Sequence, residues 1–419
     1  MTDNKSKFQL TVDFIMIVGK YFKSSKDFVN VMKVCKKYKD LVSLYKYNPI
    51  GDTWLFKNIQ TQHFYNTSDL LFIKKQMFEY IFWYTCNYIF TQKYDSNYIF
   101  KNLLFTYSDN LDIKIINNKI NIPESIKYIG KNSFKNCSEL SFITLPNKLK
   151  KIYSYAFFGS NIRTIDIPDS VTKISEKCFK ECSHLTSIKL PSQLKELDNY
   201  SLSYIDVEEI DLSNTKINII DYGTFAASEN LKTIKFNNYI KSIGSYSFFR
   251  TGIENITIPD TVTCIDDYCF HDCTKLKSIK LPNNLIELGE GCFKNSTIES
   301  IIIPEGITQI KRKCFDNCIC LTNIKLPNSL INVEYKAFAN SALINITFPE
   351  GTKFIQSKSL YYCEDIEFCI FPSTIQTIGS NSLEGCSNLK LIKIPKSFNG
   401  EKVKIALDLT EKINWELTD

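Results

Sequence analysis

The chain has 419 residues, of which 44% are hydrophobic and 23% are charged, so it is expected to build a well-buried core and is not disordered. It contains 30 Phe, 23 Tyr and 15 Cys but only 3 His. Because His is the commonest acid/base group and transition-metal ligand near neutral pH, this composition disfavours several classes of enzyme. Residues 1–122 carry 17 Lys and 10 Asp or Glu, and the rest carries 34 Lys or Arg and 35 Asp or Glu, so the net charge of +6 comes from the N-terminal segment.

Residues 1–50 do not repeat and are predicted to form a helical cap. Apolar side chains between Leu10 and Tyr21 share one helical face, and a second amphipathic helix follows Ser25, which fits a helix cap. Such helices would shield the exposed edge of the repetitive array that begins later in the chain. The basic residues Lys33, Lys36, Lys37 and Lys39 fit a solvated helix face, because no base-stacking or groove-entering motif accompanies them.

The same segment resembles an F-box, although Thr11 stands where F-boxes carry Pro. The resemblance rests on an opening Leu, an apolar helix with Asp27-Phe28, and the run Val34-Cys35-Lys36-Lys37-Tyr38, which is similar to the family's V-C-[KR]-x-[WF]. It implies a substrate adaptor of a ubiquitin ligase. The residues that would bind a Skp-type adaptor are then Leu10, Phe28, Val34, Cys35 and Tyr38.

Residues 51–121 are predicted to hold irregular first repeats, beginning near Phe56, and an aromatic-rich helix from Met77 to Phe90. Residues 122–395 then repeat twelve times, with spacings of 22 to 24 residues. Each unit ends in a short apolar strand followed by Pro, from Pro123 to Pro395, except where Ser213 and Asn237 replace it. One unit cannot bury its apolar face alone, so stacking must supply the core. We therefore predict an α/β repeat solenoid, curved, with one parallel sheet and a short helical or extended return in each unit.

An aromatic ladder is predicted on the side of the solenoid opposite the sheet. One position in the unit is Phe in nine repeats, with Leu202, Leu360 and Leu383 in the others, and each Phe should contribute about 2 kcal/mol by burial. The nine are Phe134, Phe157, Phe179, Phe225, Phe248, Phe270, Phe293, Phe315 and Phe338.

Three elements of the unit are similar to those of the BspA-like leucine-rich repeat family, in the form expanded in parasitic protists. They are the I-x-[LI]-P ending, the pair of a small residue and Phe, and the N-C-[ST]-x-L turn, seen as Asn136-Cys137-Ser138 and, with variation, as Asp272-Cys273-Thr274 and Gly385-Cys386-Ser387. The resemblance covers about 270 residues. The family is known from bacterial surface adhesins, and the resemblance implies a curved leucine-rich-repeat array that binds proteins and catalyses no reaction.

Ten repeat cysteines fall on two packing positions, which favours buried small side chains over metal or redox chemistry. Cys264, Cys320 and Cys369 fall outside both positions, and Cys320 is the candidate for oxidation. The sequence has no Walker A, H-E-x-x-H or G-x-S-x-G motif, and Gly289-Glu290-Gly291 lacks the third glycine of a dinucleotide site. We therefore predict no enzyme, no catalytic residue, no metal and no cofactor. The two packing positions are a small site before Phe (Cys178, Cys269, Cys292, Cys314) and a turn site (Cys137, Cys182, Cys273, Cys318, Cys363, Cys386).

The outward strand residues form the candidate binding surface. Lys recurs on about every second strand, and two explanations remain open: Lys and Asp on neighbouring strands neutralise each other, or lysines and apolar anchors form a binding strip. The unit between Ser213 and Asn237 is the expected break in curvature. The candidate residues are Phe142, Lys189, Asp211, Lys235, Lys280, Ile302, Lys325, Phe368, Ile370, Leu391 and Lys393.

Residues 396–419 are predicted to be a C-terminal cap or tail. Within them Lys412, Ile413 and Trp415 resemble a motif that docks onto the catalytic subunit of type 1 protein phosphatases by strand addition. The alternative is that Trp415 covers the last repeat.

Taken together, these patterns indicate a non-catalytic scaffold that binds a protein partner. The alternatives are a ubiquitin-ligase adaptor, a surface adhesin or antigen, and a phosphatase regulator. We expect a monomer that binds no nucleic acid and has no transmembrane segment. The start MTDNKSKFQL lacks the features of a secretory signal, and free thiols fit a reducing compartment, so the cytoplasm or the nucleus is the expected location.

Overall fold

The fold is that of a computed structural model of the 419-residue chain. It describes residues 115–396 at every position, and outside them mainly 20–34, 41–45, 47–50, 60–69, 79–93, 98–106 and 414–418, with single positions between. The chain divides into two units, one of residues 1–112 with 125–128 and one of 113–124 with 129–419. Each unit is described by itself.

The first unit contains helix α2 (Ser25–Val34) and a 3-10 helix, η2 (Leu41–Leu44). The cap residue of α2 is Ser24 and not Ser25, because Asp27 Oδ2 accepts hydrogen bonds from the Ser24 N–H at 2.9 Å and the Ser24 hydroxyl at 3.1 Å. Phe28 is fully buried in this unit, and its ring lies edge-on to those of Phe22, Tyr45 and Phe56. Of the predicted helical cap, α2 is therefore the described α-helix, and the helix expected between Leu10 and Tyr21 lies largely outside the described residues.

Three parallel strands follow, β1 (Thr61–Phe64), β2 (Glu79–Asn87) and β3 (Tyr98–Phe105), with the short helix α3 (Tyr88–Thr91) after β2. The prediction of a helix from Met77 to Phe90 is thus wrong for most of its length. Residues of β2 such as Tyr80, Phe82 and Cys86 are buried, and aromatic residues favour strands over helices. The Phe82 ring stacks on its neighbours across both strand pairs, which holds the three strands in register.

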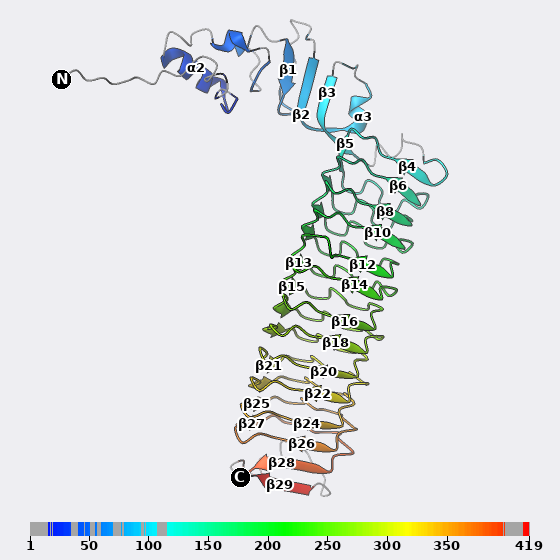
Figure 1. The fold of residues 1–419 in the computed structure, drawn as a ribbon, viewed down its shortest axis with the longest axis vertical. Coiled ribbons are helices and arrows are strands. Elements are labelled where there is room, and N and C mark those ends of the chain that lie inside the picture. Colours follow the sequence, from blue (N-terminus) through cyan, green and yellow to red (C-terminus); the bar gives the residue numbers. More distant parts are fainter. Residues whose placement is uncertain are drawn as a thin grey trace, which may run out of the picture. The chain divides into compact units, whose positions relative to one another are not determined.

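The second unit is a solenoid of parallel strands, as predicted (Figure 1). One set of strands, the first strand row, lies along one side of the stack, and most of them pair in parallel with the strand of the next coil. These strands are β4 (Lys119–Asn121), β6 (Phe142–Thr144), β8 (Thr164–Asp166), β10 (Ser187–Lys189), β12 (Glu209–Asp211), β14 (Thr233–Lys235), β16 (Asn255–Thr257), β18 (Ser278–Lys280), β20 (Ser300–Ile302), β22 (Asn323–Lys325), β24 (Asn345–Thr347), β26 (Phe368–Ile370), β28 (Leu391–Pro395) and β29 (Asn414–Thr418).

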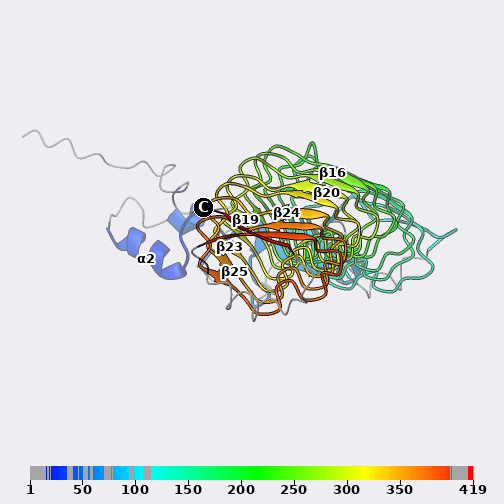
Figure 2. The ribbon, with the colours of Figure 1, turned by 90° about the horizontal axis from the view of Figure 1, so that it is seen from below.

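A second strand row, of shorter strands, runs along another side of the same coils (Figure 2). The prediction of one parallel sheet is therefore corrected to two strand rows, and within residues 115–396 no helix is present, so "α/β" does not describe the array. The second row consists of β7 (Lys151–Ile152), β9 (Lys173–Ile174), β11 (Glu196–Leu197), β13 (Ile219–Ile220), β15 (Ser242–Ile243), β17 (Cys264–Ile265), β19 (Glu287–Leu288), β21 (Gln309–Ile310), β23 (Asn332–Val333), β25 (Phe354–Ile355) and β27 (Thr377–Ile378); β5 (Ile126–Ile129) belongs mostly to the first unit.

The third side of each coil, here the turn side, is built from turns rather than from a helix. Each turn has two residues with positive φ four positions apart, such as Lys177 (52°) and Glu181 (63°). This backbone points alternate N–H groups at the next coil: Phe157 N–H donates to the Cys178 carbonyl at 2.9 Å, and Gly159 N–H donates to the Lys180 carbonyl at 2.9 Å. The turn side therefore has its own ladder of hydrogen bonds between coils.

The predicted aromatic ladder is confirmed beneath the turn side. All nine Phe residues and the three substituting Leu residues are buried, with at most 1% of the side chain exposed. Consecutive rings stack nearly parallel, for example Phe157 on Phe179 at 5.1 Å and Phe248 on Phe270 at 5.2 Å. The strand pairing of the first strand row is interrupted between β22 and β24 and also on both sides of β12 and β14, which pair with each other as a separate sheet. These strands flank the unit in which Ser213 and Asn237 replace proline.

Candidate functional site

The exposed strand face is formed by the outward side chains of the first strand row. In most of its three-residue strands the first and third side chains are exposed and the second is turned inward. The strand register brings the predicted lysines and their neighbours into line along the array: Lys189 lies beside Asp166, Lys280 beside Thr257, and Lys325 beside Ile302. The candidates predicted from the sequence thus lie on one face.

The lysines of this face divide into two groups. Lys235 forms an ion pair with Glu209 at 2.5 Å, and Lys393 forms one with Glu416 at 2.6 Å, so these two are neutralised by the neighbouring coil. Lys189, Lys280 and Lys325 are exposed and have no ion pair with any residue of the described part of the chain. The neutralisation expected from the sequence is thus seen for Lys235 and Lys393, with Glu rather than Asp as the partner, and a binding role for the other three lysines stays a prediction.

Asp211 has a structural partner in its own turn. Its Oδ1 accepts hydrogen bonds from the Ser213 N–H at 2.8 Å and the Ser213 hydroxyl at 2.6 Å, and these bonds lower the pKa of the carboxyl. In the next coil the buried side chain of Asn237 accepts from the N–H groups of Tyr239 and Ile240 and donates to the carbonyls of Thr215 and Ile217. Ser213 and Asn237 thus form turns of their own at the two positions where proline is missing.

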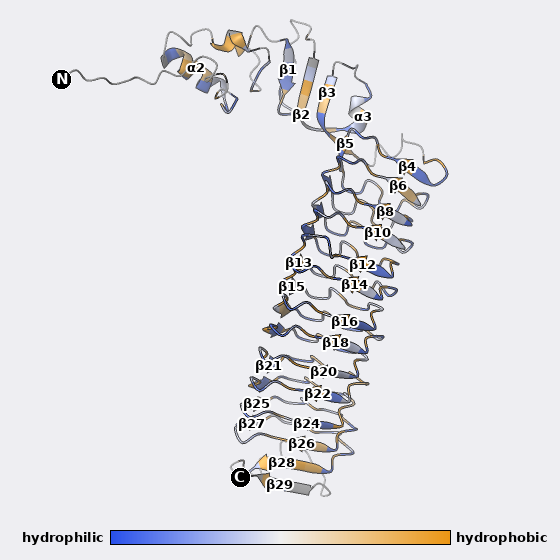
Figure 3. Ribbon diagram, viewed as in Figure 1, coloured by the Kyte–Doolittle hydropathy of each residue, from blue (hydrophilic) through white to orange (hydrophobic). Residues whose placement is uncertain are grey.

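Apolar side chains are unevenly distributed along the exposed strand face, with prominently exposed ones on β6, β20 and β26. Phe142 is 43% exposed, Ile302 is 66% exposed and Phe368 is 38% exposed. Ile370 and Leu391, on the same and the next strand as Phe368, are partly exposed. Figure 3 shows the same difference, with hydrophobic colouring on β26 and β28 and hydrophilic colouring on β12 and β14.

A shallow groove of about 610 Å³ surrounds Phe142 on β6. Lys119 and Lys189 line it from β4 and β10, and Asp166 and Thr164 line it from β8. Sequence reasoning found Phe142 and Lys189 but missed Lys119, because the strand that carries it precedes the first Pro of the repeat. The groove thus combines one apolar ring with two lysines and two carboxylates, those of Asp166 and Asp169.

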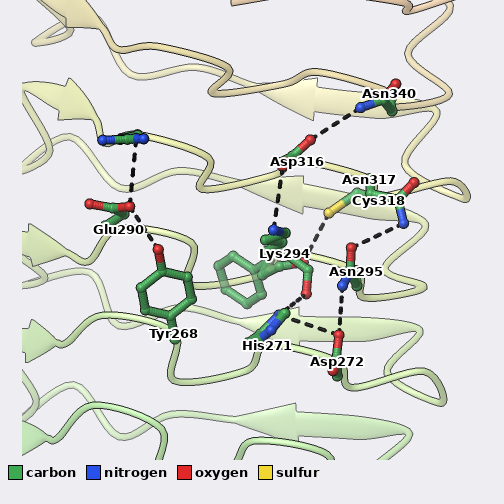
Figure 4. Close-up of polar contacts among 12 residues, drawn as sticks. Tyr268, His271, Asp272, Glu290, Lys294, Asn295, Asp316, Asn317, Cys318 and Asn340 are labelled. Atoms are coloured by element: carbon green, nitrogen blue, oxygen red, sulfur yellow. Dashed lines mark hydrogen bonds and ion pairs between the residues drawn. The ribbon is translucent and has the colours of Figure 1, made fainter.

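Polar side chains on the turn side bond to one another rather than form a reactive cluster (Figure 4). His271 Nδ1 donates to the Lys294 carbonyl at 2.9 Å and lies 3.4 Å from the Asp272 carboxylate. Asn295 donates to Asp272 at 2.7 Å, and Asn317 donates to Asn295 at 3.0 Å. In the parts of the chain that the structure describes, no group of three or more His, Cys, Asp or Glu side chains could hold a metal ion.

The three cysteines outside the packing positions differ in environment. Cys369 is fully buried, and its burial raises the pKa of the thiol. Cys264 donates a hydrogen bond to Asp266 Oδ1 at 3.0 Å, and partial burial together with this carboxylate raises its pKa. Cys320 is partly exposed. Cys264 and Cys320 are thus both more accessible to a reagent than Cys369.

The candidate residues for an F-box adaptor or a phosphatase are largely outside the described residues. Leu10, Cys35, Tyr38, Lys412 and Ile413 lie there, and Val34 is described only as the last residue of α2. Phe28 is fully buried, so its ring is not available for direct contact with an adaptor.

The backbone of Trp415 belongs to β29, in register with Ile392 of β28. The strand that would be added to a phosphatase is thus already paired along one edge within this chain. Among the helices that the structure describes, none is long and apolar enough to span a membrane.

The repeats match the BspA type leucine rich repeat region, with 6 copies, over residues 114–229, 197–319 and 287–403. A leucine-rich repeat protein from Bacteroides ovatus ATCC 8483 is 27% identical, with a TM-score of 0.65, and the match covers 80% of this chain and 92% of that protein. A leucine rich cell surface protein from Faecalibacterium prausnitzii A2-165 is 19% identical, with a TM-score of 0.42 and coverage of 78% and 86%. The pneumococcal vaccine antigen PcpA is 19% identical, with a TM-score of 0.41 and coverage of 72% and 74%.

None of the curated proteins compared with the chain matches it. The family match, by contrast, extends over residues 114–403, which is more than half of the sequence and includes both strand rows and the aromatic ladder. The chain belongs to the BspA-type leucine-rich repeat family.

Proposed function

We propose that the chain is a non-catalytic scaffold that binds a protein partner along the exposed strand face. The observation that carries the proposal is the coincidence, on one face, of lysines without an ion-pair partner and large exposed apolar side chains. Exposed apolar groups lower solubility unless another molecule covers them, and protein interfaces draw most of their affinity from a few such anchors. Phe142, Ile302 and Phe368 are the proposed anchors.

The lysines without an ion pair indicate which charge the partner is expected to carry. Lys189, Lys280 and Lys325 add positive charge beside the anchors, so the partner is expected to present acidic groups next to apolar ones. Lys235 and Lys393 are already neutralised within the chain and should contribute little to affinity.

Mutation of the anchors tests the proposal. Phe142→Asp/Ile302→Asp/Phe368→Asp would be compared with Ile286→Asp/Ile319→Asp/Ile331→Asp, a control whose residues are also exposed and apolar but lie outside the first strand row. Full-length chains carrying a photo-crosslinker at Thr144 would be used to capture the partner from native cells. The proposal expects one crosslinked protein that the anchor variant loses and the control keeps; equal capture by both variants would contradict it.

We also propose that the protein acts in a reducing compartment. Fourteen described cysteines are all free, including neighbours in successive coils such as Cys269 and Cys292, and free thiols are typical of such compartments. Fractionation of native cells, followed by thiol labelling of the protein as isolated, tests this; recovery in an oxidised, disulfide-linked form would overturn it.

A further inference from the structure

A second charged surface lies away from the exposed strand face, where the second strand row meets the turn side in the first coils of the array. Five lysines there have their ammonium groups within 6 Å of aromatic ring centres. We call this set the Lys–aromatic cluster; it consists of Lys131, Lys135, Lys151, Lys177 and Lys180 with Tyr153, Tyr155, Phe158, Tyr200 and Tyr204.

The Tyr155 ring is the centre of the cluster. Lys131 and Lys135 of the preceding coil lie 5.8 Å from its centroid, and Lys177 of the following coil lies 5.4 Å from it. Lys177 also donates to the Tyr155 hydroxyl at 3.1 Å. Three successive coils thus bring ammonium groups to one ring, so the cluster runs along the axis of the solenoid. Such contacts hold the lysine stems in place while the ammonium groups keep room for an anion.

The cluster carries an excess of positive charge. The five lysines of the cluster are paired with two carboxylates, those of Glu176 and Glu181, which gives 5 − 2 = +3. Lys177 and Lys180 are paired with their sequence neighbours Glu176 and Glu181, and Lys173 is paired with Glu196 and Asp198.

Lys131, Lys135 and Lys151 form no ion pair with the residues that the structure describes. Clustered like charges repel one another, and the ring contacts offset this only in part. A bound polyanion would offset the remaining repulsion between the lysines.

We propose that the Lys–aromatic cluster binds a linear acidic polysaccharide. The lysines of the cluster extend over three successive coils, whose spacing is about 4.8 Å, which favours an extended polymer that carries charge at several points. Ammonium groups suit carboxylate or sulfate groups, and Tyr hydroxyls suit sugar hydroxyls.

Two other polyanions fit less well. Single-stranded nucleic acid needs open aromatic faces for its bases, and here the ring faces are already approached by lysines. An acidic protein would take its affinity from apolar anchors in a desolvated centre. Of the aromatic residues in the cluster, Tyr204 alone is prominently exposed and could serve as such an anchor.

The test measures binding of the full-length chain to heparin and to polygalacturonate, with poly-glutamate and oligothymidine as comparison polyanions at the same salt concentration. Lys131→Gln/Lys135→Gln/Lys151→Gln removes three charges of the cluster. Lys189→Gln/Lys280→Gln/Lys325→Gln removes three equally unpaired charges of the exposed strand face and is the matched control. Tyr155→Leu removes the central ring without changing the charge.

We expect at least one polysaccharide to bind more tightly than both comparison polyanions. The cluster variant should weaken this binding at least tenfold and make it less dependent on salt, the control should change it less than twofold, and Tyr155→Leu should weaken it at least threefold. Equal losses in the two triple variants, or binding of oligothymidine or poly-glutamate as tight as that of the polysaccharides, would overturn the proposal. Because the control residues belong to the exposed strand face, this result is independent of the protein partner proposed above.

Discussion

The Sγ of Cys182 donates a hydrogen bond to the carbonyl oxygen of Phe157 in the preceding coil, at 3.0 Å. Cys273, Cys318 and Cys363 make the same bond to the ladder Phe of the coil before them, at 3.0 to 3.1 Å. In the 22-residue coils the same site holds Ser or Thr, except at Ile205, and Ser160 lies 3.5 Å from the Cys182 sulfur. The turn site is therefore mostly a polar ladder of thiols and hydroxyls beside the aromatic one.

The buried thiols of this ladder predict a loss of stability at alkaline pH. Burial raises the pKa of Cys182 and Cys318 to about 12 and that of Cys273 and Cys363 to about 11, from an ordinary value of 9.0. Below pH 9 both the folded and the unfolded chain keep these protons; above it the unfolded chain releases them first. The free energy of unfolding should thus fall as the pH rises from 9 toward 11, as measured by urea unfolding at pH 8 and at pH 10.5.

The double variant Cys182→Ser/Cys318→Ser separates this effect from other alkaline titrations. Serine fills the same site in other coils, so the variant should fold with a loss of about 1 kcal/mol per site and should lose less stability between the two pH values. An unchanged alkaline loss in the variant would show that these thiols do not cause it. In the native wild type, a thiol reagent at pH 8 should label Cys320 before the buried ladder cysteines such as Cys182 and Cys318.

The sequence predicted the two buried ladders but not the hydrogen bonds between thiols and backbone carbonyls. The periodic Phe and Cys positions identify buried ladders because stacking aligns equivalent residues of successive coils. The alternation of Cys137-type turns with Ser160-type turns is also visible in the sequence, but the thiol–carbonyl bond depends on the backbone of the turn. That backbone uses positive φ at residues such as Lys177 and Tyr246, whose side chains do not favour it. Hydrogen bonds from the next coil impose this conformation there, and the sequence signals it only at the turn positions that hold Gly or Asn, such as Gly159 and Asn295.

The aromatic ladder should be the main source of stability in the middle of the array. Phe270 is fully buried between Phe248 and Phe293, with ring centroids at 5.2 and 5.6 Å. Phe270→Ala should therefore lower the free energy of unfolding by about 3–5 kcal/mol, since it leaves a cavity between two rings. Phe142→Ala, which truncates a 43% exposed ring, should lower it by less than about 1 kcal/mol. Urea unfolding of both variants checks this, and similar losses would contradict the ladder.

Gly289 has a structural explanation that the sequence could not provide. A Cβ at this position would lie 2.3 Å from the carbonyl carbon of Asp266 and 2.4 Å from the nitrogen of Asp267 in the preceding coil. Gly289→Ala should force the two coils apart and cost about 1–3 kcal/mol in urea unfolding. Lys311→Ala, at the equivalent position one coil later, removes an exposed ion pair with Glu287 and should cost less than about 1 kcal/mol. Equal stability of the two variants would contradict the close approach of the two coils at Gly289.

The exposed strand face was predicted more completely than the Lys–aromatic cluster, because strand alternation alone indicates which side chains point outward. The cluster joins Lys131 and Lys135 of one coil, Lys151 and Tyr155 of the next and Lys177 of a third. Tyr155 and Lys177 are equivalent in the repeat, but Lys131, Lys135 and Lys151 occupy three other positions. Only the path of the turn side brings them together. A repeat alignment compares equivalent positions and cannot identify such a group.

His63, in the first unit, predicts a loss of stability at acid pH. Its ring stacks on Tyr47 at 4.5 Å, and burial, with a contribution from Lys101, lowers its pKa from 6.5 to about 4. Above pH 6.5 both states are neutral; below it the unfolded chain takes up a proton that the folded one does not, so the free energy of unfolding falls until the pH approaches 4. The loss at pH 5 should be about 2 kcal/mol. His63→Phe, which keeps a ring against Tyr47, should remove that part of the difference in urea unfolding between pH 7.5 and pH 5. A variant as acid-sensitive as the wild type would show that His63 is protonated in the folded chain.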